Sequence, residues 1–380
     1  MGFKIGNATY SESENNLSST LSVINYFDAG LTLNDFKVTN LTATDFSPTA
    51  DYADADGDLA HPTTPFSMSP RTFEWRDKYD NVISPSNYNQ KLGCGSSLNL
   101  PLKLRITLPN VKVKSRYGNP SESIPTELVK EYKIGTATGI CFAKPNSLYW
   151  KNDWGAPGNS TNGGGYNPDH FDPDNGFKAS LNPKFPTTGF AKASFTLVMT
   201  SNVNDYSFSV LKPDGSLLTD GSVTVDTTGK VTLNSKPSGA VTIKAIFKSD
   251  TNQVDYYTFN PTSVWVVPKG LTYYNYANAK TECGTASQIP SRAQLTNSPL
   301  NNLTTGGSLI SNAYTRAVGG GVFGEWGKTN STNYPGSLWA GSRYWTRDAR
   351  STSHQFVVDS VDGNVYYVKN SYSYYVACLE

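Results

Sequence analysis

The chain has 380 residues, more than one compact core usually holds, so we expect two to four domains. Its 32 basic and 31 acidic side chains nearly cancel, which excludes the strongly basic surface that a nucleic-acid partner requires. No apolar run approaches the ~20 residues of a membrane helix, and the N-terminus lacks the charged and apolar regions of a signal peptide. If the protein is exported, we therefore expect this chain to be a fragment of it.

Residues 1–167 are predicted to form one enlarged β-sandwich domain, and a split into two smaller units stays open. In Leu100–Leu108 every second residue is leucine or isoleucine, which predicts a strand with one buried face. The segment Trp150–Asp174 is rich in glycine, asparagine and proline. Such residues disfavour strand interiors, so this segment predicts a long loop or a domain junction.

Residues 168–268 carry the strongest strand signals and predict a second β-sandwich of about 100 residues. Ser222–Val225 and Lys230–Leu233 alternate polar and apolar side chains around a turn, which predicts a hairpin. Val241–Phe247 has one apolar face and predicts a further strand, with two more strand signals before residue 268.

Residues 269–380 change in character and predict an α+β unit. Thr272 is the expected cap of a first helix running through Tyr273 to Lys280, and Ser291 is the expected cap of a second, shorter helix. After a Gly-rich middle, Gln355–Asp359 and the residues following Asp362-Gly363 predict a hairpin. A final strand is expected to end at Cys378.

The four cysteines contain no C-x-x-C pair, which disfavours a zinc site or a thioredoxin-like motif. The simplest interpretation is two disulfides in an oxidising compartment, Cys94–Cys141 and Cys283–Cys378, each within one domain. The alternative is four buried thiols in a cytosolic protein. We favour the disulfides, because Cys378 lies almost at the chain end, where a thiol needs a reason to be ordered.

Several short segments of the second half share a pattern with one known family. In the last 110 or so residues they are Ala279–Cys283, Ile289–Arg292, Glu325–Gly327, Tyr344–Arg347 and Tyr375–Cys378. Upstream they are Gly176–Lys178, Phe185–Phe195 and Lys236–Gly239. Together they resemble the intimin and invasin family of bacterial adhesins, in whose C-type-lectin-like domains a helix leads into a cysteine that pairs with one in the final strand. The resemblance is weaker over residues 1–165.

The resemblance implies a mainly β protein in which tandem Ig-like β-sandwich domains, 1–167 and 168–268, precede an α+β C-type-lectin-like binding domain, 269–380. It also implies an outer-membrane anchor in a part of the protein not in this chain. The expected partner is a host cell-surface, matrix or immunoglobulin protein. Integrin binding in invasin depends on a Ser-Asp-Met tripeptide, which this sequence lacks, so the host protein stays open. A glycan-binding lectin and a bacterial self-association module are the alternatives.

Metal and cofactor motifs give little support, and we expect no cofactor. Asp54, Asp56 and Asp58 surround a glycine turn and are weak calcium candidates, but they do not fit an EF-hand loop, and a solvated turn is favoured. The Glu/Gln-Pro-Asn/Asp loop of calcium-dependent lectins is absent from the residues after Gly270. We therefore expect a protein binder, or at most a calcium-independent glycan binder.

Catalysis is not expected either. The three histidines lie in separate segments, and the sequence has neither a nucleophile-elbow nor a zinc-protease motif. His170 lies between Asp169 and Asp172 and is an alternative metal-binding group, although a solvated loop is favoured. A pair of glycosidase carboxylates stays a minor alternative, because any two acids can meet in a fold.

A cluster of aromatic and charged residues near the C-terminus is the predicted ligand-binding site. Tryptophan, tyrosine and arginine dominate protein–protein hot spots, because they bury large areas and donate hydrogen bonds. From the resemblance, Trp326 and Trp345 are expected to fill the core of the lectin-like domain. The predicted contact residues, which fall mostly in a Gly/Ser/Asn-rich stretch, are Trp339, Arg343, Tyr344, Arg347, Asp348 and Arg350. Except for Tyr344, these residues are expected to be exposed.

Overall fold

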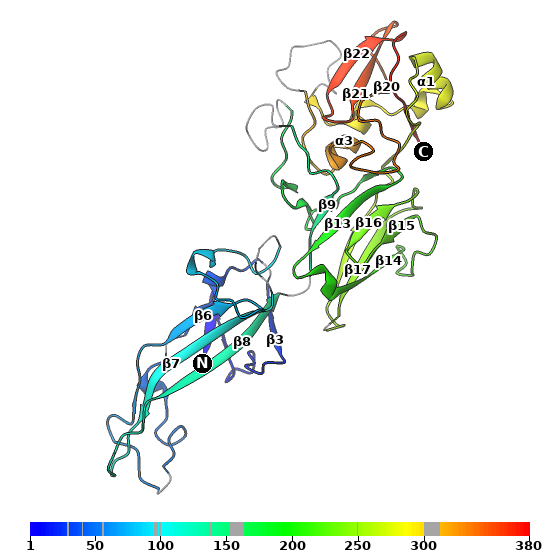
Figure 1. Cartoon of the computed structure of the whole chain (residues 1–380). Helices are drawn as coiled ribbons and strands as arrows, with labels where there is room; N and C mark the ends of the chain where they lie inside the picture. The colour runs from blue at the N-terminus through cyan, green and yellow to red at the C-terminus, as the bar shows by residue number, and fades with distance from the viewer. Residues whose placement is uncertain are drawn as a thin grey trace. The chain divides into compact units, whose positions relative to one another are not determined.

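The computed structural model describes residues 1–28, 30–39, 41–54, 57–94, 98, 100–136, 139–151, 163–248, 250–299 and 312–380. The chain divides into two compact units, unit 1 at Met1–Ala137 and unit 2 at Thr138–Glu380 (Figure 1). The strands far outnumber the helices, which confirms the predicted mainly β class. In the described part of the chain, no helix has the length and apolar character needed to cross a membrane.

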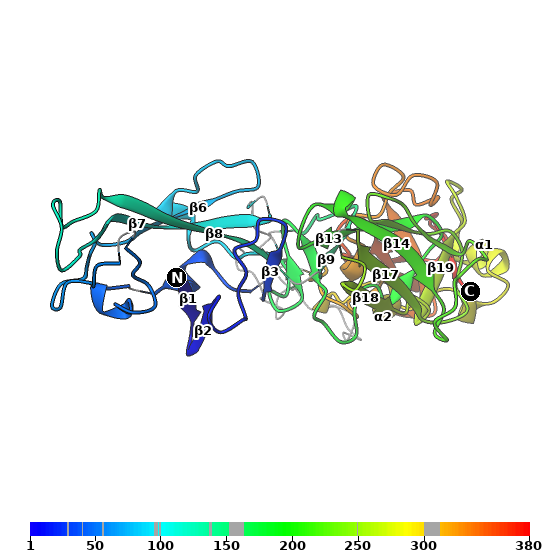
Figure 2. The same cartoon turned by 90° about the horizontal axis from the view of Figure 1, so that it is seen from below.

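Unit 1 is built from two sheets. One has the strand order β2-β1-β4, and the other has the order β3-β8-β7-β5 with β6 also paired to β7. The pairing of β3 with β8 is parallel, and the long β7–β8 hairpin is antiparallel (Figures 1 and 2). The strands are β1 (Gly2–Ile5), β2 (Ala8–Ser11), β3 (Ile24–Phe27), β4 (Lys37–Val38), β5 (Phe66–Ser67), β6 (Thr72–Arg76), β7 (Leu102–Val113) and β8 (Thr126–Thr136).

The core of unit 1 follows from the alternation predicted for β7. Leu102, Leu104 and Ile106 are buried, whereas the lysine and arginine between them are half-buried on the opposite face. Aromatic side chains join the two sheets: the ring of Phe3, on β1, lies 6.3 Å from that of Tyr132, on β8. The apolar face of one sheet therefore closes against the other, as in a sandwich.

The first part of unit 2 is an Ig-like sandwich of two sheets, ordered β10-β11-β9-β13-β16-β15 and β14-β17-β18. The predicted hairpin is confirmed, because β15 pairs with β16 around the Asp226 turn. The strands are β9 (Ile140–Pro145), β10 (Phe171–Asp172), β11 (Gly176–Lys178), β13 (Ala193–Met199), β14 (Tyr206–Leu211), β15 (Val223–Val225), β16 (Lys230–Leu233), β17 (Val241–Phe247) and β18 (Val254–Phe259). β9 precedes residue 168 yet pairs with β13, and the three domain boundaries stay predictions.

The last part of unit 2 has a sheet ordered β20-β21-β22 and three short helices. The predicted hairpin is confirmed by the pairing of β21 with β22. Figure 1 shows α3 between this sheet and the strands β13 and β16. The elements are α1 (Tyr276–Glu282), α2 (Arg292–Leu295), α3 (Gly321–Trp326), β20 (Arg343–Ala349), β21 (His354–Asp359), β22 (Val365–Lys369) and β23 (Ala377–Leu379).

The helices were predicted with mixed success. Ser291 caps α2, as expected, in a capping box with Gln294. Thr272 is not the cap of α1, which begins three residues later than expected, because the backbone of Tyr274 is hydrogen-bonded in an extended pairing with Tyr374. The cap is Asn275. No helix was predicted for α3, whose two glycines hide its helical character.

One hydrophobic core runs through both parts of unit 2. Phe185 and Phe195 of the sandwich pack against Trp326 of α3, with ring centres 4.8 and 6.4 Å apart. In addition, β19 (Val264–Pro268), which also pairs with β12 (Thr188–Gly189), pairs with the final strand β23. The sandwich and the lectin-like part are therefore joined by packing and by backbone hydrogen bonds.

Candidate functional site

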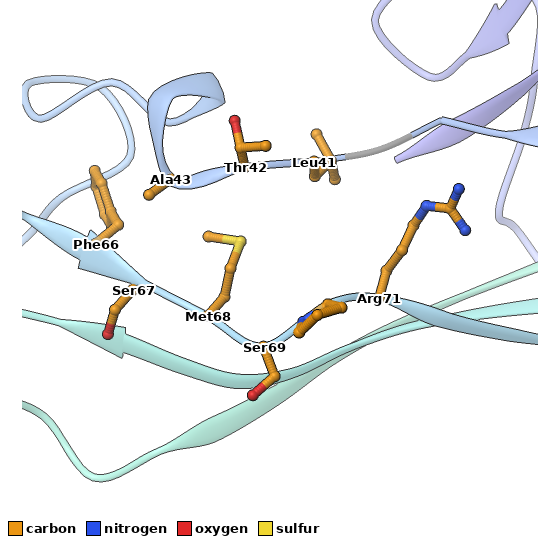
Figure 3. Close-up of a pocket in the computed structure, with 9 residues that line it drawn as sticks. Leu41, Thr42, Ala43, Phe66, Ser67, Met68, Ser69 and Arg71 are labelled. Atoms are coloured by element: carbon orange, nitrogen blue, oxygen red, sulfur yellow. The ribbon is translucent and has the colours of Figure 1, made fainter.

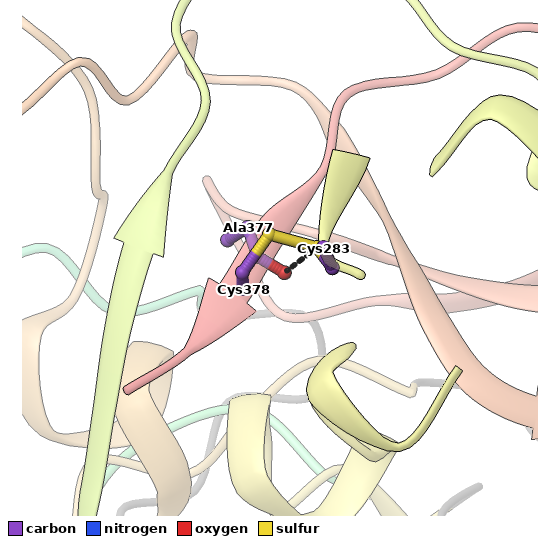
Figure 4. The surroundings of a disulfide bond; sticks show 3 residues. All are labelled: Cys283, Ala377 and Cys378. Carbon is purple, nitrogen blue, oxygen red and sulfur yellow. Dashed lines mark hydrogen bonds between the residues drawn. A yellow bond between two sulfur atoms is a disulfide. The ribbon is translucent and has the colours of Figure 1, made fainter. Parts of the chain in front are cut away.

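A disulfide closes the lectin-like part of unit 2. Cys283 follows the last residue of α1 and is bonded to Cys378 on β23, with the two Cα atoms 5.4 Å apart (Figure 4). The predicted pairing of these two residues is confirmed. Cys94 and Cys141 are disulfide-bonded as well, and none of the four cysteines is free.

Buried aromatic residues fill the interior behind the predicted site. Trp326 and Trp345 are fully buried, as expected. The prediction that Trp339 is exposed was wrong, because its ring is fully buried against Phe323 and Tyr344. Tyr344 is fully buried too, and its hydroxyl oxygen accepts a hydrogen bond from the Ala340 amide at 2.7 Å. These two residues therefore support the site from below and do not reach its surface.

A fully buried arginine, Arg316, links the lectin-like part to the segment that follows β9. The Arg316 side chain donates four hydrogen bonds to backbone carbonyl oxygens, at 2.9 Å for Ser147, 2.8 Å for Tyr149, 3.1 Å for Gly324 and 2.9 Å for Glu325. These bonds replace the water that a guanidinium loses on burial, and burial still lowers the pKa of Arg316. These hydrogen bonds hold together segments of unit 2 that are far apart in sequence.

The buried carboxylate of Glu325 has the complementary role. It accepts hydrogen bonds from the amide and hydroxyl groups of Thr187 and Thr188 and from the amide of Gly319, at distances between 2.7 and 3.2 Å. Burial raises the pKa of Glu325 in spite of these donors. We call Arg316 and Glu325, with the groups they bind, the junction network. The sequence did not predict it, because no local motif marks either residue as buried.

Four of the predicted contact residues reach the surface along β20 and at the residue that follows it. Arg347 is exposed, and Arg343, Asp348 and Arg350 are half-buried. Arg343 lies with its guanidinium carbon 3.9 Å from the ring centre of Tyr366, and its Nε is 3.9 Å from an Asp359 oxygen. Asp348 accepts the backbone amide of Arg292, the first residue of α2, at 2.6 Å. Arg343 and Asp348 thus brace neighbouring elements.

Arg347 and Arg350 have few partners inside the molecule. Arg347 donates one side-chain hydrogen bond, to the Ser287 carbonyl at 3.2 Å. The guanidinium carbon of Arg350 lies 3.8 Å from the ring centre of Tyr367, which is 51% exposed. Within the described ranges, neither arginine forms an ion pair. Sequence reasoning missed Tyr367, because the register of β21 and β22 brings it beside Arg350.

His354 and Lys369 complete this surface. They are opposite each other in the β21–β22 ladder, and the His354 ring centre lies 6.2 Å from that of Tyr367. We call Arg347, Arg350, His354, Tyr367 and Lys369 the tip face. It carries three full positive charges and one exposed aromatic ring, so it favours a partner surface with carboxylates or other acceptors.

The metal candidates receive no support from geometry. Asp56 lies outside the described residues, so the calcium prediction at that turn is not tested in full. Among the residues that are described, no three acids, histidines or cysteines form a metal-binding group. His170 instead accepts the backbone amide of Val318 at 3.2 Å through Nδ1, and Asp172 accepts amides of its own turn.

Comparisons with known proteins agree with this architecture. The family model of invasin domain 4 matches residues 170–259. An invasin of Yersinia enterocolitica is 28% identical over 193 residues, which cover 50% of this chain and 20% of that protein. The chain therefore spans about one fifth of the length of this relative.

Two solved structures match parts of this chain at low sequence identity. The crystal structure of invasin, described as a bacterial integrin-binding protein, is 16% identical, with a TM-score of 0.46; it covers 86% of this chain and 53% of that one. A 282-residue C-terminal fragment of intimin, solved with the intimin-binding domain of the translocated intimin receptor, is 14% identical, with a TM-score of 0.39. That match covers 73% of this chain and 93% of the fragment. The domain match and the Yersinia relative show that this chain is similar to the intimin and invasin family of adhesins, and they confirm the resemblance predicted from the sequence.

Proposed function

We propose that the chain is the surface-exposed C-terminal passenger region of an outer-membrane adhesin, whose lectin-like tip binds a host protein. The similarity to this family supports the proposal, because one similar structure is described as integrin-binding and another was solved in complex with a receptor domain. The membrane anchor belongs, in this proposal, to a part of the protein outside the chain. Binding, and not catalysis, is the activity that we assign.

The observation that carries the proposal is the pair Arg347 and Arg350 on the tip face. Their N–H groups have no carboxylate partner among the described residues, and the Tyr367 ring holds Arg350 in place. An arginine ordered before binding loses less rotamer entropy when a partner arrives. Arg343 and Asp348, which are half-buried, stand at the margin of the proposed interface.

The proposal is tested with the full chain immobilised on beads and incubated with solubilised surface proteins of epithelial cells and with plasma. We expect specific host proteins to bind the unchanged chain and to be lost when Arg347 and Arg350 are both replaced by alanine. Lys212→Ala is the matched control, since it removes an exposed cation of the sandwich part of unit 2 and leaves the tip face unchanged. Melting curves of the three proteins should differ by no more than the loss of one exposed cation–π contact, about 0.5–1 kcal/mol.

Three results would count against the proposal. Equal capture by the double variant would move the interface to another face. Binding to a glycan array that persists in chelator, without capture of protein, would favour a calcium-independent lectin. Concentration-dependent self-association of the chain that alanine at Arg347 and Arg350 abolishes would favour a bacterial self-association module.

A further inference from the structure

A pocket in unit 1 has apolar walls and a single charged group. It has a volume of about 550 Å³ and is lined by residues of two segments, Leu41–Ala43 and Phe66–Arg71. Figure 3 shows Phe66, Met68 and Arg71 rising from one segment toward the opposite wall, where Leu41 and Ala43 lie. Ser67 and Ser69 point the other way. The volume is within the usual range for a small-molecule site, about 300–1,000 Å³.

The arginine at one end of this pocket is poorly satisfied. Its Nη2 donates to the Val38 carbonyl at 2.5 Å, and its Nε is buried without an acceptor. The nearest ring, that of Phe73, has its centre 5.9 Å from the guanidinium carbon. In the described ranges no carboxylate pairs with Arg71, and burial lowers its pKa. A cation in partly apolar surroundings without a counter-charge is costly, so its presence needs a reason.

We propose that this pocket binds a small ligand with an apolar body and a carboxylate head. The carboxylate would accept hydrogen bonds from those N–H groups of the Arg71 guanidinium that do not donate to the Val38 carbonyl, since arginine donates strongly to carboxylate oxygens. The apolar body would lie against Phe66, Met68 and Leu41. Two sources offer this chemistry, a free fatty acid and the C-terminal apolar residue of a peptide. The site is independent of the tip face, and its function stands apart from host-protein binding.

Methionine labelling gives a direct test in the full chain. The sequence has three methionines, and of these only Met68 lines the pocket, so a protein labelled with carbon-13 at the methionine methyl groups gives one reporter and two internal controls. Met199 lies in β13 of unit 2, and Met1 is at the N-terminus of unit 1. We expect decanoate or N-acetyl-leucine to shift the Met68 resonance in a saturable way while the other two stay in place.

Neutral analogues isolate the role of the charge without any substitution. Decanol matches decanoate, and N-acetyl-leucinamide matches N-acetyl-leucine, so each pair differs in the carboxylate. We expect the neutral compound of the active pair to bind at least about tenfold more weakly, the loss typical of one charged hydrogen-bonded contact. A saturable shift of Met68 by decanoate assigns the site to fatty acids. A saturable shift by N-acetyl-leucine assigns it to peptide C-termini.

Arg71→Gln provides the second line of evidence. It should weaken binding of the active carboxylate about tenfold, whereas Arg76→Gln, which removes a cation paired with Glu74 outside the pocket, should leave it unchanged. If Arg71→Gln disturbs the resonance of Met1, the variant has lost its fold and the analogue pairs alone decide. The proposal is overturned if neither carboxylate shifts Met68, or if the neutral analogues bind equally well.

Discussion

Arg316 in the junction network and Arg350 on the tip face both lie against an aromatic ring, yet they differ in what their N–H groups bind. The guanidinium carbon of Arg316 is 4.4 Å from the ring centre of Phe171, and four of its five N–H donors bind backbone carbonyl oxygens. That of Arg350 is 3.8 Å from the Tyr367 ring, and it forms no ion pair with a described residue. Residue type therefore does not distinguish a structural arginine from one available to a partner. The number of its N–H groups that are already hydrogen-bonded within the molecule does.

Replacing Arg316 by methionine should give the largest effect on this comparison. The change leaves four buried carbonyl acceptors without their donor, so we expect the free energy of unfolding of unit 2 to fall by about 3–5 kcal/mol. Urea denaturation followed by tryptophan fluorescence measures this loss. A loss below about 1 kcal/mol would mean that water replaces the guanidinium, and that the network is not structural.

Removing the disulfide should come next. For Cys283→Ala with Cys378→Ala we expect a loss of about 2–5 kcal/mol, because the bond closes a long loop of the unfolded chain. If the disulfide stabilised the lectin-like part alone, that part would loosen before the sandwich. The shared core of unit 2 instead predicts that both lose stability in a single transition. Hydrogen exchange at β17 and β21 in the double variant distinguishes the two outcomes.

Glu325→Gln tests the other half of the junction network through pH. Because burial raises the pKa of Glu325 above its ordinary 4.5, the native state takes up a proton more readily than the unfolded state. The contribution of this group is therefore fully present below pH 4.5 and is lost as pH rises through the native pKa. We expect wild type to lose stability relative to Glu325→Gln over that window. Parallel curves of unfolding free energy against pH would contradict this prediction.

Arg350→Ala should have the smallest effect on stability. An exposed cation–π contact contributes about 0.5–1 kcal/mol, so the free energy of unfolding of unit 2 should fall by no more than this amount. Host-protein capture, in contrast, should fall clearly. A stability loss as large as that of Arg316→Met would remove the distinction drawn between the two arginines.

Local signals in the sequence were enough for much of the fold. The alternation of Leu102, Leu104 and Ile106 predicts a strand without knowledge of its neighbours, and so does the turn between β15 and β16. The helix α3 could not be predicted in this way. Its Gly321 has a φ of 72°, and a Cβ there would lie 2.7 Å from the Thr296 amide, so the packing of α2 on α3 determines this residue.

The candidate site was predicted in part, for a related reason. The sequence analysis predicted a site from the aromatic and charged residues between positions 339 and 350. Four of them, Arg343, Arg347, Asp348 and Arg350, do reach the surface. It could not tell which aromatic rings turn inward. Trp339 follows a residue with a φ of 65°, Leu338, whose own side chain is 56% exposed, and this local backbone directs the tryptophan into the core. The ring that does face solvent, Tyr367, comes from another strand.

The disulfide between Cys283 and Cys378 also decides how the tip would carry tension. Under the proposed function, the chain would be pulled at two points, its bound ligand and the part of the protein that anchors it. For a ligand held at Arg350, the shorter covalent route to β19 runs forward through β21, β22 and β23, across the sulfur atoms and back through α1. The residues between Cys283 and Arg350 lie off that route. Under force the lectin-like part would therefore extend less than it would without the disulfide. The residues off the route, among them α2, α3 and the buried Arg316, would not bear the force.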